Sequence, residues 1–181
     1  MKKIKDCIRE ALADEKKGKK HRGLLITTPD QKIAKEYIEK AKMNLGLCDT
    51  LKNAGYDYKI PEEWFYTLYY CALAVLAKFG VESRNQACTA AFLQHVKKNN
   101  LIEYDDEFIE RIWVLREKDE ISDVDKRENA RYSPATKIAE VESRYGHMTL
   151  LCKRAISQAE DIIYAKNQYA IPKELTTFIP T

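Results

Sequence analysis

The segment 64–80, WFYTLYYCALAVLAKFG, constrains the fold most because it is apolar on almost every side. Pro61, Glu62 and Glu63 come just before it, and proline followed by acidic residues is typical of the first turn of an α-helix. A helix that is apolar on most sides is buried at the centre of a bundle. Thr67 interrupts the apolar run and charges flank it, so a membrane span is not expected.

Other segments repeat apolar residues at helical spacing. Residues 3–17 form one such segment. A second begins at Thr28-Pro29-Asp30-Gln31, where Thr28 is the expected cap, and closes at Asn53-Ala54-Gly55. Ser83 and Gln86 predict a capping box at the start of a helix that extends to about residue 98. The last two helices are expected from Asp105 or Asp106 through Leu115, and from Ser133-Pro134 to Ile163 with an interruption at Gly146.

No segment has the alternating pattern of a strand, and only Leu24–Thr27 could be extended. We therefore predict an all-α fold, an antiparallel up-and-down bundle of four to five helices with an extra N-terminal helix. The expected organisation is an N-terminal helix and basic linker over 1–27, the bundle over 28–168, and an irregular tail over 169–181.

Cysteine usage and charge limit the classes of function. The five cysteines are widely spaced, and we expect them to be small buried residues in a reducing compartment. The three histidines lie near no cysteine pair, so we predict no metal and no cofactor.

The charged N-terminus lacks the apolar core of a signal peptide, which predicts a cytoplasmic protein without a membrane partner. The net charge of +3 does not by itself indicate a nucleic-acid binder.

Local basic residues leave two interpretations open. The cluster over residues 16–22 is either a solvated linker, which we favour, or an arm that attracts phosphate. Arg84 and Asn85 precede a helix, where they either cap it or bind an anion. His95 lies about three helical turns from Arg84, too far to share a site, and is expected to be a surface or packing residue.

Eleven tyrosines are the other compositional signal. Tyr66 and Tyr70 lie four residues apart on one helical face, with Tyr69 beside them. Core packing with satisfied hydroxyls is the favoured interpretation, and a polar-lined groove at a dimer interface is the alternative. A glycine-rich phosphate loop, a zinc HExxH pair and a nucleophile elbow are absent from the sequence.

The stretch EEWFYTLYYCALAVLAKFGVESRNQACTAAFLQHV, followed by REKDEISDVDKRENARY, resembles the HEPN domain superfamily, especially its archaeal and bacterial members. The resemblance covers about residues 28–168 and is most distinctive over Trp64–Val96. It implies a dimeric helical bundle. Many relatives are metal-independent ribonucleases or toxins that pair with a nucleotidyltransferase.

The active residues of those relatives are an arginine and a histidine that are separated by four to six residues. Arg127 matches the arginine, and Tyr132 occupies the histidine position. A phenol with a pKa of about 10 is a poor general base at neutral pH. Relatives also often carry histidine where Gln86 stands here. The residues that could still hold a phosphate or stack a base are Arg127, Asn129, Arg131 and Tyr132.

Three functions follow as alternatives. We favour a HEPN-like homodimer that binds a nucleotide, RNA or a partner protein without efficient catalysis. The second is a metal-independent endoribonuclease that uses Arg127. The third is a structural partner subunit of a nucleotidyltransferase. Loss of the histidine favours the first and the third over the enzyme.

Overall fold

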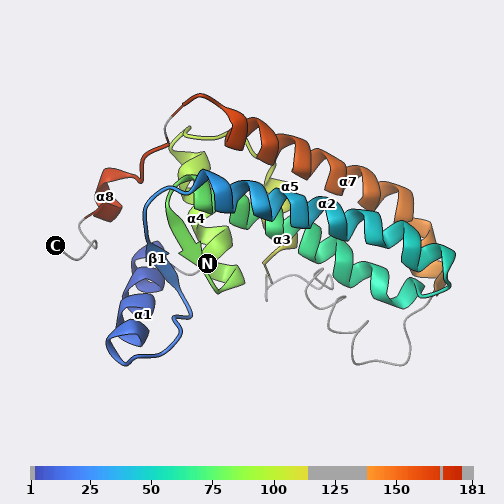
Figure 1. Ribbon diagram of the computed structural model, residues 1–181, viewed down its shortest axis with the longest axis horizontal. Helices are drawn as coiled ribbons and strands as arrows, with labels where there is room; N and C mark the ends of the chain where they lie inside the picture. Colours follow the sequence, from blue (N-terminus) through green and yellow to red (C-terminus); the bar gives the residue numbers. More distant parts are fainter. Residues whose placement is uncertain (1–2, 114–137, 168, 177–181) are drawn as a thin grey trace.

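The protein is seen in a computed structural model that describes residues 3–113, 138–167 and 169–176. Three long helices lie side by side in it: α2 (Gln31–Asn53), α3 (Ile60–Lys78) and α7 (Ile138–Tyr164). α2 is joined to α3 by a short 3-10 turn, Asp57–Lys59, and runs antiparallel to both α3 and α7 (Figure 1). The predicted helical bundle is confirmed in this part of the chain.

α3 is the central helix, as its composition predicts. It packs against α2, α7, α4 (Gln86–Lys98) and α5 (Asp106–Arg111). Its buried residues come from nearly all sides of the helix, and they include Trp64, Phe65, Leu68 and the whole run Cys71–Ala77. Pro61 lies in the first turn with Glu62 and Glu63, and Gly80 ends the helix at φ +73°.

Both predicted caps are wrong by two residues. α2 begins after Asp30, whose carboxylate accepts a hydrogen bond from the Ile33 amide at 2.9 Å, so Thr28 lies outside the helix. α4 begins after Asn85, whose Oδ1 accepts from the Cys88 amide at 3.1 Å, and Ser83 lies in a strand. In each case a short oxygen-bearing side chain directly before the helix satisfies a free N–H.

A two-stranded antiparallel ribbon was not predicted. β1 (Leu24–Ile26) pairs with β2 (Val81–Ser83) in the register Leu24↔Ser83 and Ile26↔Val81. Each strand has three residues, too few to show an alternating pattern, and the two are far apart in the chain. The ribbon joins the N-terminal part of the chain to the end of α3.

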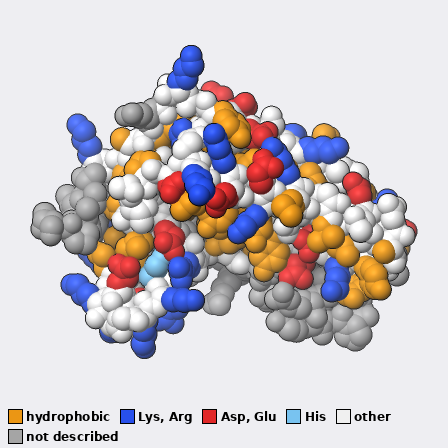
Figure 2. Space-filling view, in the orientation of Figure 1, with side chains coloured by type: hydrophobic (Ala, Val, Ile, Leu, Met, Phe, Trp, Pro, Cys, Tyr) orange, Lys and Arg blue, Asp and Glu red, His pale blue; other side chains and the backbone are white. Residues whose placement is uncertain are grey.

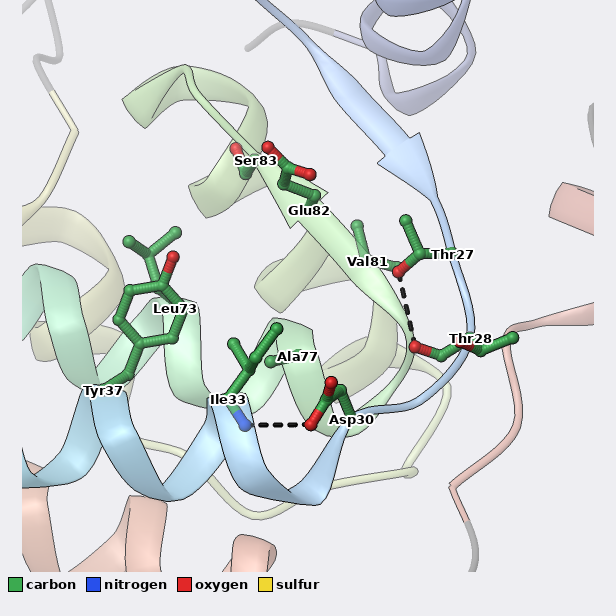
Figure 3. A pocket seen from close by; sticks show the side chains of 10 residues that line it. All are labelled: Thr27, Thr28, Asp30, Ile33, Tyr37, Leu73, Ala77, Val81, Glu82 and Ser83. Atoms are coloured by element: carbon green, nitrogen blue, oxygen red, sulfur yellow. Dashed lines mark hydrogen bonds between the residues drawn. The ribbon is translucent and has the colours of Figure 1, made fainter.

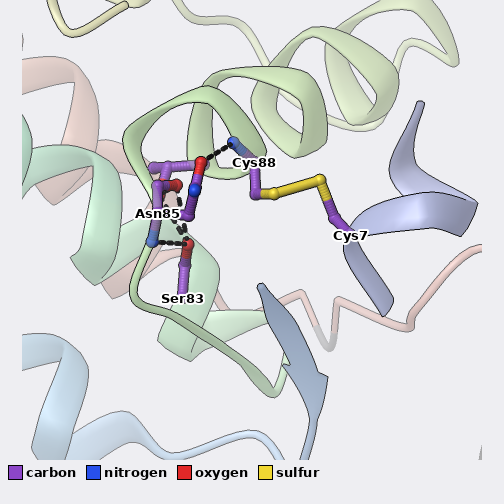
Figure 4. Close-up of a disulfide and its surroundings, with 5 residues drawn as sticks. Cys7, Ser83, Asn85 and Cys88 are labelled. Carbon is purple, nitrogen blue, oxygen red and sulfur yellow. Dashed lines mark hydrogen bonds between the residues drawn. A yellow bond between two sulfur atoms is a disulfide. The ribbon is translucent and has the colours of Figure 1, made fainter. Parts of the chain in front are cut away.

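Cys7 of α1 (Ile4–Lys16) forms a disulfide with Cys88 of α4, across 81 residues of sequence (Figure 4). The expectation that all five cysteines are reduced is therefore wrong. The spacing of the cysteines could not reveal this pair, because it depends on how α1 packs against β1 and α4. Cys48, Cys71 and Cys152 are free and buried.

The C-terminal elements differ in length from the predictions. α5 has six residues and ends at Arg111, and Ile112, directly after it, is also buried in the core. α7 runs through Gly146 without the expected interruption. The tail, expected to be irregular, contains the short helix α8 (Lys173–Thr176). Within the described ranges, no helix is both long enough and apolar enough to cross a bilayer.

Candidate functional site

Most of the predicted site residues lie outside the described part of the chain. Arg127, Asn129, Arg131 and Tyr132 all fall within residues 114–137. Arg84 and Asn85 are described, and they follow β2 directly. The described part of the predicted site therefore consists of Arg84 and Asn85.

The side chain of Asn85 is turned toward the first turn of α4, where it caps the helix (Figure 4). Ser83 and Thr89 complete a small network around it. The Thr89 hydroxyl donates to Ser83 Oγ at 2.7 Å, and Ser83 Oγ donates to the Asn85 carbonyl at 3.2 Å. Asn85 therefore positions the turn that carries Arg84.

Arg84 is exposed. Its Nε donates to Oε1 of Glu82 at 2.8 Å, and His21 Nε2 lies 3.2 Å from the same oxygen. Burial opposes ionisation of Glu82, but the bonds from Arg84 and His21 outweigh burial and lower its pKa. The bond uses only Nε, so the terminal nitrogens of the guanidinium can reach a ligand.

Three half-buried tyrosines form a stacked row, and one of them, Tyr37, lines a pocket together with Glu82. Tyr37 of α2 stacks on Tyr70 of α3, with ring centroids 6.1 Å apart and planes 21° from parallel. Tyr70 stacks in turn on Tyr66, at 5.9 Å and 26°. Such separations between nearly parallel rings are offset stacks, so the rings overlap only in part. We call Tyr37, Tyr70 and Tyr66 the tyrosine row.

Positive charge lies next to the tyrosine row. Nζ of Lys40 is 5.7 Å from the centroid of Tyr37 and 5.9 Å from that of Tyr70. Burial raises the pKa of both phenols, so they are neutral hydrogen-bond donors at pH 7. The charge of Glu82 raises the pKa of Tyr37 further, and the charge of Arg84 lowers it.

Tyr37 also forms one wall of a pocket of about 230 Å³ (Figure 3). Ile33 and Tyr37 reach from α2 toward Leu73 and Ala77 of α3, and β2 forms the opposite side. The polar lining consists of hydroxyl and carboxylate groups, contributed by Thr27, Thr28, Asp30, Tyr37, Glu82 and Ser83. An apolar floor with a polar rim is typical of a small-ligand pocket.

Sequence reasoning missed several members of this site. Tyr37 has no local signal of its own, and His21 was considered only as part of the basic cluster and among the three histidines. Tyr66 and Tyr70 were recognised from their spacing, although core packing was favoured for them. Tyr69, also on α3, stacks on Phe65 instead of on a ring of the row, with centroids 5.8 Å apart.

The arrangement provides stacking, charge and hydrogen bonds. Among the residues that the structure describes, no group of three His, Cys, Asp or Glu side chains is placed to hold a metal ion. His21 is 5% exposed and contacts Glu82, so it is enclosed by protein rather than presented to a substrate. These groups fit the recognition of an aromatic, anionic ligand.

Comparison with known proteins adds no relative: no family model, no curated protein and no solved structure matches this chain.

Proposed function

We propose that the protein is a HEPN-like helical module that binds single-stranded RNA through the tyrosine row and Arg84. The observation that carries this proposal is the row itself. Tyr37, Tyr70 and Tyr66 come from two helices, are half-buried, and stack in sequence beside Lys40, and the charge of Arg84 acts on Tyr37.

The chemistry of RNA suits these groups. Unpaired bases stack on aromatic side chains, and each stacked base contributes about 1–3 kcal/mol. The guanidinium of Arg84 can bind a phosphate oxygen through its terminal nitrogens while Nε stays on Glu82. The neutral phenols add hydrogen-bond donors for base edges or the 2′-hydroxyl.

Binding without cleavage agrees better with this site than catalysis does. A general base for RNA cleavage must lose its proton near pH 7 and reach the 2′-hydroxyl. Burial moves the pKa of Tyr37 and Tyr70 away from neutrality. We therefore propose a binding module without efficient catalysis. We propose that it acts as a homodimer because the HEPN resemblance implies one.

Fluorescence anisotropy tests the proposal, with a labelled single-stranded RNA of about 12 nucleotides in buffer that contains EDTA. Tyr70→Ala should weaken binding roughly tenfold, because it removes the middle ring of the row. Tyr70→Phe should bind nearly as well as the wild type, since stacking needs only the ring. Arg84→Ala should weaken binding about tenfold as well.

Tyr58→Ala is the matched control. Tyr58 is 41% exposed and contacts Tyr56 in the turn before α3, outside the tyrosine row. It should bind RNA like the wild type. Equal affinities of Tyr70→Ala, Arg84→Ala and the wild type would rule out this surface as the RNA site, provided that the variants keep their helical circular dichroism.

A further inference from the structure

The last residue of α1 and the chain that follows it toward β1 concentrate positive charge. Residues 16–22, here called the basic arm, hold four lysines and one arginine, all exposed: Lys16, Lys17, Lys19, Lys20 and Arg22. The net charge of the whole chain is only +3, so the remainder of the protein is slightly acidic. Figure 2 shows Lys and Arg side chains around the end of the molecule that α1 forms.

The backbone of the basic arm is held in place by Asp14, which is 7% exposed. The Asp14 carbonyl accepts hydrogen bonds from the amides of Lys17 and Lys19, both at 3.0 Å. Its Oδ2 accepts from Arg22 N at 3.1 Å and from Arg22 Nε at 3.3 Å. The arm is thus an ordered turn in which the lysine side chains extend to solvent while the main chain is anchored.

The basic arm leads directly into the candidate site. His21, within the arm, is buried against Glu82, and the carbonyl of Gly23, just after the arm, accepts from the Arg84 amide at 3.3 Å. Gly23 lies so close to α1 that an added Cβ would be 2.0 Å from the Cys7 carbonyl oxygen. The disulfide from Cys7 to Cys88 fastens α1 to the helix that follows Arg84. These contacts hold the arm beside Arg84.

We infer that the basic arm is a second contact surface for RNA, which binds the phosphate backbone next to the bases held by the tyrosine row. Glu82 links the two surfaces: it contacts His21 of the arm and Arg84, and it lines the pocket together with Tyr37. The inference rests on the proposed function and extends it. Lysines on an ordered turn bind phosphates as point charges without reading sequence, so their contribution should depend steeply on salt.

The test measures RNA affinity by anisotropy over a series of salt concentrations. In the arm variant K16Q/K17Q/K19Q/K20Q, the slope of log affinity against log salt should become shallower by about 0.7 for each phosphate that the protein no longer neutralises. If two or three lysines bind phosphates, the slope changes by roughly 1.5–2. At low salt the arm variant should bind more than tenfold more weakly than the wild type.

A control variant removes the same charge elsewhere. K32Q/K98Q/K153Q/K166Q changes four exposed lysines outside the arm and alters the net charge equally. It should keep the wild-type slope. Equal slopes for the arm variant and the wild type, or equal losses in the arm and control variants, would overturn the inference while RNA binding by the tyrosine row stands.

Two further measurements test RNA binding by the wild-type protein and lipid binding by the arm. If the wild-type protein binds no RNA, the proposed function fails and the inference fails with it. Sedimentation with vesicles of phosphatidylcholine and phosphatidylserine tests whether the arm is a membrane contact instead. Vesicle binding that the arm variant loses, with unchanged RNA affinity and salt slope, would overturn the inference in favour of a lipid surface. We expect vesicle binding to be absent.

Discussion

Tyr37 of α2 stacks on Tyr70 of α3 with ring centroids 6.1 Å apart, and this contact joins the first two long helices at the edge of the candidate site. Tyr37 is also a wall of the pocket, while Tyr70 continues the row to Tyr66. The register between α2 and α3 therefore decides whether the aromatic surface exists.

Gly80→Ala should be strongly destabilising. Gly80 has φ +73°, and an added Cβ would lie 2.6 Å from the Thr27 carbonyl oxygen and 2.7 Å from the Pro29 nitrogen. Both are backbone atoms, so relief requires a shift of the chain that leads into α2. We expect a loss of about 3 kcal/mol in the free energy of unfolding, measured by urea denaturation.

Gly55→Ala is the control for Gly80→Ala. Gly55 has a similar φ of +75°, but nothing lies within 4 Å of its added Cβ. Gly55→Ala should lower the free energy of unfolding by only about 1 kcal/mol, which is the penalty of the left-handed backbone alone. Equal losses in both variants would mean that Gly80 does not pack closely against Thr27 and Pro29.

Reduction of the Cys7–Cys88 disulfide should destabilise the protein. The bond links residues 81 positions apart, and a loop of that length corresponds to about 4 kcal/mol of unfolded-state entropy. The double variant Cys7→Ser/Cys88→Ser should lose a similar amount. Thermal unfolding with and without dithiothreitol measures the effect, and the double variant should show no response to dithiothreitol.

Alkylation and mass spectrometry check the pairing itself. Three thiols, Cys48, Cys71 and Cys152, should react in the denatured oxidised protein, and five after reduction. In the native state these three should react slowly, since burial raises the pKa of Cys48 to about 12 and that of Cys71 still further. Five reactive thiols without reduction would contradict the disulfide.

Glu63→Gln should stabilise the protein slightly at pH 7. Burial, followed by the charge of Glu62, raises the pKa of Glu63 in the folded state. The unfolded chain therefore loses its proton first, and stability falls as the pH rises from the unfolded to the folded pKa. Glutamine keeps an acceptor for Asn44 Nδ2, now 2.5 Å from Glu63 Oε2, without the charge.

The gain should be at most about 1 kcal/mol, because Glu63 is only half-buried and solvent screens its charge. Unfolding measured from pH 4 to 8 should show the difference between Glu63→Gln and the wild type shrinking toward acid. Glu36→Gln, at an exposed position on α2, is the control and should change little. A Glu63→Gln variant that is less stable at pH 7 would show that the carboxylate is favourable there.

The helices could be predicted from the sequence because their buried apolar residues recur at helical spacing. α3 is the clearest example, since its apolar character on most sides identified it as the central helix. The caps were predicted two residues too early. Thr28 and Ser83 have short side chains with an oxygen that can accept a hydrogen bond, as do the true caps, Asp30 and Asn85. Only the local backbone direction distinguishes these candidates.

The candidate site was less accessible to sequence reasoning because its parts come together only in the fold. The spacing of Tyr66 and Tyr70 revealed one pair, but Tyr37 joins them from another helix. His21 meets Glu82 through the pairing of two three-residue strands. No local pattern predicts such contacts between distant segments.

Photocrosslinking tests the central claim most directly. Single-stranded RNA that carries 5-iodouridine reacts with aromatic rings on which the base stacks, and mass spectrometry identifies the crosslinked peptides. The tyrosine row predicts crosslinks at Tyr37, Tyr66 or Tyr70, lost in Tyr70→Ala and retained in Tyr58→Ala. Crosslinks confined to other residues, such as Tyr56 and Tyr58, would contradict the account.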